Sequence, residues 1–148
     1  MAAKEIKKQT LVWLEDDPKD LATIKNCFEK CNLEKRVDLT LLLVKPQSDS
    51  FEEVLKKITD LGPEVTVFTD GLEAKMSCVV NAARANVPQR RVGYVTTSSR
   101  NEAMEVTLEV YKLDFYSKWK LGDRKAFKDF VLGEGNGEEV KRKFAGVK

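Results

Sequence analysis

The sequence contains no histidine, and this absence excludes more chemistry than any other feature of its composition. Without histidine the chain has no Ser-His-Asp triad, no Cys-His nucleophile pair and no His-ligated zinc site. It also cannot carry a phosphohistidine of its own. Acid, base or metal chemistry therefore has to come from carboxylates, lysines and hydroxyls.

Cysteines and long apolar runs are also scarce. The three cysteines are an odd number and too few for a four-ligand zinc site, and no apolar run approaches the length of a membrane span, about 20 residues. No signal-peptide pattern precedes the cysteines. Unpaired thiols are typical of a reducing compartment, so we expect a cytoplasmic protein with no membrane span.

An excess of charge of either sign is the third absence. The 26 Lys and Arg residues against 24 Asp and Glu residues give a net charge of +2, which disfavours nucleic acid and acidic membranes as partners. The 148 residues, 42% of them hydrophobic, suit a single globular domain. We place this domain at residues 1–133 and expect the glycine-rich, charged residues 134–148 to form a flexible tail. The basic cluster Lys141–Lys143 in that tail is typical of a solvated chain end.

Five short apolar segments alternate with five amphipathic segments along the chain. The expected strands are Thr10–Leu14, Val37–Val44, Val65–Thr69, Arg91–Val95 and Asp114–Ser117. This alternation predicts an α/β fold with a five-stranded parallel sheet, helices on both faces and right-handed crossovers.

Each expected helix has a recognisable start. Asp17 is placed to cap the first helix, with proline at its first position. Capping-box patterns begin at Ser50 and Ser99 and predict the starts of the second and fourth helices. The third helix is expected near Glu73–Ala85 and the fifth from about Asp123 to Leu132.

The residues that follow the strands carry the chemistry, because ligands bind beyond the carboxyl ends of parallel strands. Glu15, Asp16 and Asp17 follow the first strand and Asp70 the third, while Thr96 and Lys118 follow the fourth and fifth. Clustered carboxylates repel one another unless a cation neutralises them, and Mg²⁺ is the natural oxygen-bound partner. A lysine and a hydroxyl beside that ion suit a phosphoryl group.

These segments resemble the receiver domain of two-component response regulators over residues 10–132. The sequences LVWLEDDP, VTVFTD, YVTTSS and FYSK carry the resemblance, and the spacing of 22 residues from Thr96 to Lys118 matches the family. The resemblance, and not the spacing of elements, implies a doubly wound, flavodoxin-like sheet with the strand order 2-1-3-4-5.

The resemblance also implies a role for each site residue. Asp70 is the phospho-acceptor and Lys118 pairs with it, while Thr96 and Phe115 form the conformational switch. Magnesium is held by three carboxylates and one backbone carbonyl, those of Glu15, Asp16, Asp70 and Leu72.

The implied function is that of a stand-alone receiver that signals by binding other proteins. A sensor histidine kinase or phosphotransfer protein would supply the phosphoryl group, and a downstream protein would read the switched conformation. The fourth helix, fifth strand and fifth helix would form a homodimer surface. No turnover is expected beyond self-phosphorylation and autodephosphorylation.

Several positions depart from the family pattern. Ala74 stands where the acceptor loop has a proline, after the small Gly71. Asp16 and Asp70 are 54 residues apart, about ten more than in the family, and Asp70 and Thr96 are 26 apart, a few fewer. Trp119 replaces the proline after the lysine, and a cis bond without proline costs about 2.5–4 kcal/mol. We therefore expect a trans or strained bond before Trp119 and a displaced lysine ammonium.

Other interpretations remain open. Taken singly, Asp17 is a helix cap, Asp70 with its glycine a turn, Thr96–Ser99 a capping segment, and Lys118 a solvated lysine. A pseudo-receiver would keep the fold but serve only as an interaction module. A flavin- or nucleotide-binding protein could use Thr96–Ser99 as a phosphate loop, but carboxylates after the first strand would repel a phosphate, and no GxGxxG or Walker pattern exists.

Overall fold

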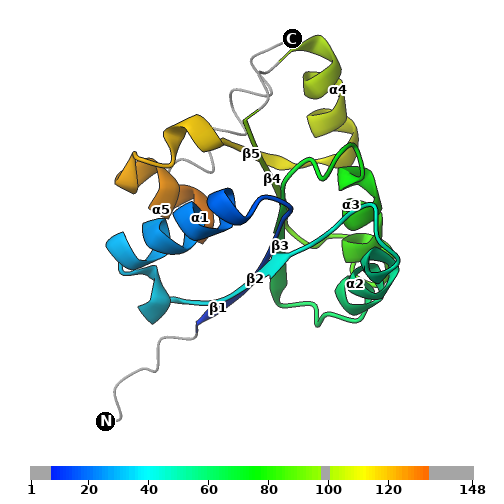
Figure 1. Cartoon of the computed structure of the whole chain (residues 1–148), viewed down its shortest axis with the longest axis horizontal. Helices are drawn as coiled ribbons and strands as arrows, with labels where there is room; N and C mark the ends of the chain where they lie inside the picture. The colour runs from blue at the N-terminus through cyan, green and yellow to red at the C-terminus, as the bar shows by residue number, and fades with distance from the viewer. Residues whose placement is uncertain (1–7, 98–100, 134–148) are drawn as a thin grey trace.

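The structure of the protein, a computed structural model, describes residues 8–97 and 101–133. The described chain alternates strands and helices throughout (Figure 1). The strands are β1 (Gln9–Glu15), β2 (Val37–Leu43), β3 (Val65–Thr69), β4 (Val92–Thr96) and β5 (Asp114–Ser117). The helices are α1 (Pro18–Lys30), α2 (Ser50–Thr59), α3 (Met76–Ala85), α4 (Glu102–Tyr111) and α5 (Arg124–Leu132), with short 3₁₀ turns η1 (Leu33–Lys35) and η2 (Lys118–Lys120).

The five strands form one parallel sheet in the order β2-β1-β3-β4-β5. This confirms the predicted fold class and strand order. The register sets Leu14 of β1 beside Thr69 of β3, and the Asp70 amide donates to the Leu14 carbonyl at 3.1 Å. The first residue after β3 is thereby fastened next to Glu15 at the end of β1.

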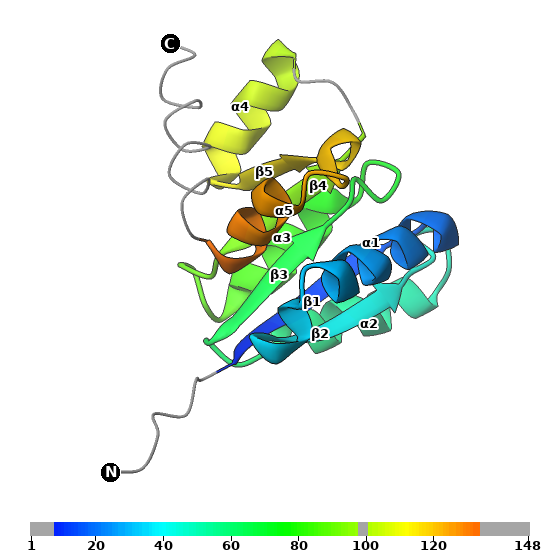
Figure 2. The same ribbon diagram turned by 90° about the vertical axis from the view of Figure 1, so that its left-hand side faces the viewer.

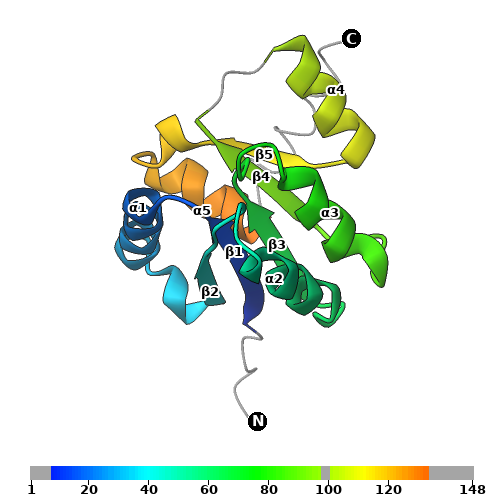
Figure 3. The same cartoon turned by 45° about the vertical axis from the view of Figure 1, so that its right-hand side comes forward.

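Helices cover both faces of the sheet. Helices α1 and α5 pack on one face (Figure 2), and α2, α3 and α4 pack on the other (Figure 3). Because both faces are covered, β3 is buried along its whole length, as its unbroken apolar run predicts. Among the described helices, none is both long and apolar enough to cross a membrane.

The face under α1 and α5 has an aromatic core. Trp13 of β1 packs edge-on against Phe68 with ring centroids 5.2 Å apart, and it stacks on Phe127 of α5 at 6.0 Å. A side chain at Gly93 would place its Cβ 2.6 Å from the Phe68 ring, so glycine is required there for β4 to approach. Burying each of these rings contributes about 1.5–3 kcal/mol, which makes this layer a rigid base for the site.

The predicted helix starts are borne out in part. Asp17 caps α1 by accepting from the Lys19 amide at 2.8 Å, with Pro18 at the first helical position, and Asp123 caps α5. The capping box at Ser50 is wrong, because Ser50 is itself the first helical residue and Asp49 precedes it without a side-chain cap.

Helices α3 and α4 start later than expected. Helix α3 begins at Met76, because the backbone at residues 72–74 is left-handed instead of helical. Helix α4 is capped by Asn101, which accepts from the Met104 amide at 2.9 Å. The predicted cap Ser99 and the predicted tail 134–148 lie outside the described residues.

Candidate functional site

The carboxyl ends of β1, β3, β4 and β5 bring the predicted site residues to one edge of the sheet. Glu15 is the last residue of β1 and Asp16 follows it, while Asp70 comes directly after β3. Thr96 is the last residue of β4, and Lys118 follows β5. Parallel strands end at the same edge, so residues far apart in the sequence become neighbours.

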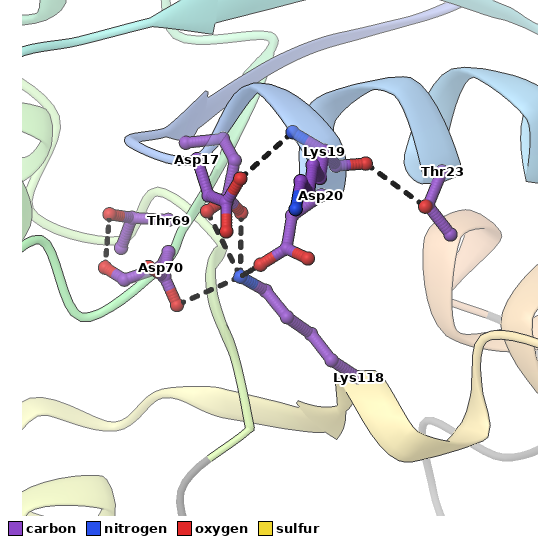
Figure 4. A network of polar contacts seen from close by, with 8 residues as sticks. Asp17, Lys19, Asp20, Thr23, Thr69, Asp70 and Lys118 are labelled. Atoms are coloured by element: carbon purple, nitrogen blue, oxygen red, sulfur yellow. Dashed lines mark hydrogen bonds and ion pairs between the residues drawn. The ribbon is translucent and has the colours of Figure 1, made fainter.

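Lys118 lies at the centre of this edge and contacts three carboxylates (Figure 4). Its Nζ is 3.0 Å from Oε1 and 2.8 Å from Oε2 of Glu15. The same nitrogen is 2.8 Å from Oδ2 of Asp20 and 3.1 Å from Oδ1 of Asp70. Only 4% of the Lys118 side chain is exposed, so these ion pairs are weakly screened by solvent.

Asp20 is the site residue that the sequence reasoning missed. It lies in the first turn of α1, where a carboxylate is favoured by the helix dipole and needs no further explanation. Its position three residues after the Asp17 cap, on the helix that starts at the acidic edge, is the signal that could have revealed it. We call Glu15, Asp16, Asp20 and Asp70 the acidic centre.

The expected displacement of the lysine ammonium is wrong. The bond between Lys118 and Trp119 is trans, as expected, yet the ammonium reaches the acidic centre. The turn η2 places it there: the Ser117 hydroxyl accepts from the Trp119 amide at 3.2 Å, and the Trp119 indole donates to the Thr97 carbonyl at 3.0 Å. These two bonds orient the turn without proline.

Negative charge at the acidic centre exceeds what one ammonium neutralises. Burial raises the pKa of Glu15 to about 7, with the charge of Asp70 adding to the rise and the bond to Lys118 opposing it. Burial and a hydrogen bond to Asp70 raise the pKa of Asp16. Burial opposes the charge on Lys118, but its bonds to Asp20 and Glu15 outweigh that effect and raise its pKa.

The donor set at this edge fits a hard divalent cation. One carboxylate oxygen each from Glu15, Asp16 and Asp70 lie within 4.8 Å of one another. In an octahedral magnesium site, ligand oxygens lie roughly 3–4 Å apart, so a small inward movement would let all three surround one ion. The Glu15 Oε2 atom is buried and makes no aligned hydrogen bond, but it forms an ion pair with Lys118 at 2.8 Å, so a cation would share this oxygen with the ammonium.

The Leu72 carbonyl, predicted as a further ligand, faces a different partner. It accepts from the Lys75 amide at 3.0 Å in a turn where Leu72, Glu73 and Ala74 have φ values of 49°, 53° and 72°. The turn is fastened to the segment after β2, because Lys75 Nζ donates to the Pro46 carbonyl at 2.8 Å. Left-handed backbone in three consecutive residues with side chains is strained.

The predicted switch residues lie on the α3–α4 side of this edge. Thr96 is buried and lines a cavity of about 700 Å³ together with Asp70 and Tyr94. Phe115 of β5 is also buried, and its ring meets Tyr94 edge-on with centroids 6.2 Å apart. Thr96 therefore faces the same cavity as Asp70, and Phe115 contacts Tyr94, which lines that cavity too.

No protein-family model and no curated protein sequence matches this chain. Solved structures match it in shape. The isolated REC domain of RcsB from Salmonella enterica serovar Typhimurium, in the apo form, has a TM-score of 0.62 at 13% identity, covering 86% of this chain and 90% of that one. A response regulator from Thermotoga maritima has a TM-score of 0.58 at 13% identity, covering 85% and 99%.

The bacteriophytochrome response regulator AtBRR has a TM-score of 0.55 at 19% identity, covering 85% of this chain and 91% of its own. At such low identity the likeness concerns the fold, and it confirms the resemblance that the strand-end motifs predicted. This protein has the receiver fold of response regulators.

Proposed function

We propose that the protein is a receiver module that takes a phosphoryl group from a partner's phosphohistidine onto Asp70 in a magnesium-dependent step. One observation carries the proposal: the buried Lys118 ammonium lies 3.1 Å from Asp70 Oδ1, inside a group of carboxylates close enough to share a cation. A lone turn aspartate or a solvated lysine would not account for this convergence.

Asp16, Asp70 and Glu15 would hold the magnesium ion. When bound, the ion would neutralise charge on the transferring phosphoryl group. Asp16 and Asp70 offer the more accessible oxygens, since Glu15 is fully buried and shared with Lys118. For the Leu72 carbonyl to join them, the left-handed turn would have to yield its bond to the Lys75 amide.

In the transfer itself, an Asp70 carboxylate oxygen would attack phosphorus in line with the leaving nitrogen. The new P–O bond forms as the P–N bond breaks. The electron pair of the broken P–N bond remains on the imidazole nitrogen of the partner. Lys118 would pair with a phosphoryl oxygen as its bond to Oδ1 loosens. Positioning and charge neutralisation perform most of the work in such transfers.

The dianionic phosphoryl group would then attract the Thr96 hydroxyl, and Phe115 would follow into the space that Thr96 leaves. This two-state repacking is our proposed signal. Val106 and Val110 of α4 are exposed by 59% and 68%. They would contribute to the surface of α4, β5 and α5 that binds a downstream protein or a second copy.

The phosphoryl donor would be a histidine kinase or phosphotransfer protein, because these 148 residues offer no histidine to carry the group. We place the protein in the cytoplasm, in keeping with its three free thiols.

A labelling experiment tests this function. The parent protein is incubated with radiolabelled acetyl phosphate and Mg²⁺, beside Asp70→Asn and the control Asp38→Asn, which alters an exposed carboxylate on β2. We expect acid-stable, base-labile label on the parent and the control, no label on Asp70→Asn, and none when EDTA replaces magnesium. An unlabelled parent, or label that persists on Asp70→Asn, would refute the proposal.

A pseudo-receiver is the second candidate, and the turn at residues 72–74 favours it. If that turn is locked, the Leu72 carbonyl stays hydrogen-bonded to the Lys75 amide and cannot become a magnesium ligand. The magnesium site that phosphorylation needs would then be incomplete. Beryllofluoride with Mg²⁺ distinguishes the two, because it mimics the phosphoryl group on a competent aspartate. A fluorescence change from Trp119, absent in Trp119→Phe, supports the receiver, and an unchanged spectrum supports the interaction module.

A further inference from the structure

We propose that Tyr94 shields the phosphorylated Asp70 from water and thereby sets how long the signal lasts. The inference rests on the proposed function and adds a positioning residue to it. It is carried by the contact between Tyr94 and the residue that follows Asp70, and by the cavity that opens beside both.

The Tyr94 hydroxyl lies directly over Gly71. A Cβ atom added to Gly71 would come within 3.3 Å of Tyr94 Oη. The backbone at Gly71 is not left-handed, so its conformation does not demand glycine. A side chain at this position would crowd the tyrosine hydroxyl by a few tenths of an ångström, so the absence of one lets Tyr94 lie close to the Gly71 backbone. Tyr94 and Gly71 are thus a size-matched pair one residue from the acceptor.

The cavity of about 700 Å³ would give water a route to Asp70, which lines it. Asp70, Gly71, Tyr94 and Thr96 all line it. Tyr94 and Thr96 face it together, because alternate residues of a strand point to the same side. The Tyr94 ring lines the cavity, and its edge-on contact with Phe115, with ring centroids 6.2 Å apart, restricts its orientation.

The step that this arrangement would slow is hydrolysis of the aspartyl phosphate. A water oxygen attacks phosphorus, the bond from phosphorus to the Asp70 oxygen breaks, and that oxygen keeps the electron pair. The products are the Asp70 carboxylate, inorganic phosphate and one proton. The attacking water must lie in line with the leaving oxygen. A ring that crowds the cavity beside Asp70 lowers the frequency of that alignment.

The same ring is coupled to the proposed switch. Phe115 touches Tyr94, so the inward movement of Thr96 and Phe115 on phosphorylation would press the tyrosine further over Gly71. Shielding would therefore be strongest in the phosphorylated state.

The test compares Tyr94→Leu with Tyr111→Leu, a matched change at a residue that lines the same cavity from the C-terminal end of α4. Each protein is labelled with acetyl phosphate and Mg²⁺, the donor is removed, and loss of label is followed over time. We expect Tyr94→Leu to lose label about three- to tenfold faster than the parent. Tyr111→Leu should follow the parent, and Tyr94→Phe, which keeps the ring, should lie between the parent and Tyr94→Leu.

The outcomes separate this inference from the proposed function. A labelled parent whose lifetime equals that of Tyr94→Leu, or a Tyr111→Leu that accelerates equally, overturns the shielding role and leaves the receiver function standing. A parent that takes no label overturns both. Circular dichroism confirms folding, and should Tyr94→Leu fail to fold, Tyr94→Phe with a Thr107→Ala control on the cavity wall decides the same question, a lifetime equal to the parent's overturning the role.

Discussion

Asp16 lies beside Asp70 at the acidic centre, where burial and their shared hydrogen bond raise its pKa. A raised carboxyl pKa means that the ionised form is unfavourable in the folded protein. Lys118 does not relieve Asp16 by direct contact, since its ion pairs are with Glu15, Asp20 and Asp70. An ionised Asp16 therefore destabilises the metal-free protein, as is common for clustered charges at functional sites.

Asp16→Asn should for this reason raise the free energy of unfolding of the metal-free protein, by about 1 kcal/mol at pH 8. The same change should weaken Mg²⁺ binding if the proposed site forms, because one of its three carboxylates is lost. Urea denaturation measures the first effect and magnesium titration of Trp fluorescence the second. The exposed Asp38→Asn should change neither, and an Asp16→Asn protein less stable than the parent would contradict this account.

Glu15 makes stability depend on pH. Its pKa is raised from 4.5 to about 7, so the folded protein holds this proton more tightly than the unfolded chain. The stabilisation is fully present below the unfolded pKa and is lost as pH rises towards 7. Lys118 keeps its charge over this range because its pKa is raised.

We expect the free energy of unfolding without Mg²⁺ to fall by about 2 kcal/mol between pH 5 and pH 8. Glu15→Gln should flatten that dependence. Urea denaturation at a series of pH values measures both, and an equally steep fall in Glu15→Gln would show that another group is responsible.

At the scale of elements, the turn between β3 and α3 carries strain beside Asp70. Ala74 has a φ of 72°, a left-handed conformation that costs a residue with a side chain about 1–2 kcal/mol. The turn is closed by the Leu72–Lys75 bond and tied to the segment after β2 by Lys75 and Pro46. A strained turn of this kind can be switched by a ligand that favours another conformation.

Ala74→Gly should accordingly raise the free energy of unfolding by about 0.5–1 kcal/mol, the strain relieved less the added entropy of the unfolded chain. Ala82→Gly, inside α3, should lower it by a similar amount because that backbone is helical. Urea denaturation of both proteins is the measurement. Equal destabilisation by the two changes would show that residues 72–74 are not left-handed in solution.

At the scale of the whole molecule, a buried arginine network and the acidic centre lie at opposite edges of the sheet. Arg90 is buried where the strands begin and donates to four carbonyls, those of Leu61, Gly62, Val65 and Ala83. It thereby joins the end of α2, the start of β3 and the end of α3. The acidic centre lies where the strands end.

Arg90→Met should lower the free energy of unfolding by about 3 kcal/mol or more, because it leaves several buried carbonyls unpaired. Arg90→Lys should lose less, since an ammonium still offers three donors. Labelling of Asp70 per folded molecule should be unchanged in both. Chemical denaturation and the acetyl phosphate assay measure the two properties, and a label lost in proportion to stability would argue against their separation.

Most of the fold could be predicted from local sequence. The apolar run Val65–Thr69 is a buried strand with the predicted bounds, and Asp17 with Pro18 begins α1 as expected. Such features depend on neighbouring residues alone, so the pattern of residue types along the sequence is enough to predict them. The predicted start of the third helix near Glu73 was wrong because the left-handed turn at residues 72–74, tied down by Lys75, displaces it to Met76, and the second helix begins at Ser50 without the predicted capping bond.

The sequence by itself determined the alternation of strands and helices, the exclusion of histidine chemistry and the set of polar residues at the strand ends. Only the tertiary structure decided that Asp20 joins the acidic centre, that Trp119 orients the Lys118 turn, and that Tyr94 fills the space over Gly71. These three relations join residues up to 98 positions apart. Distances of that kind follow from how the helices and turns pack around the sheet, and no local pattern of residue types encodes them.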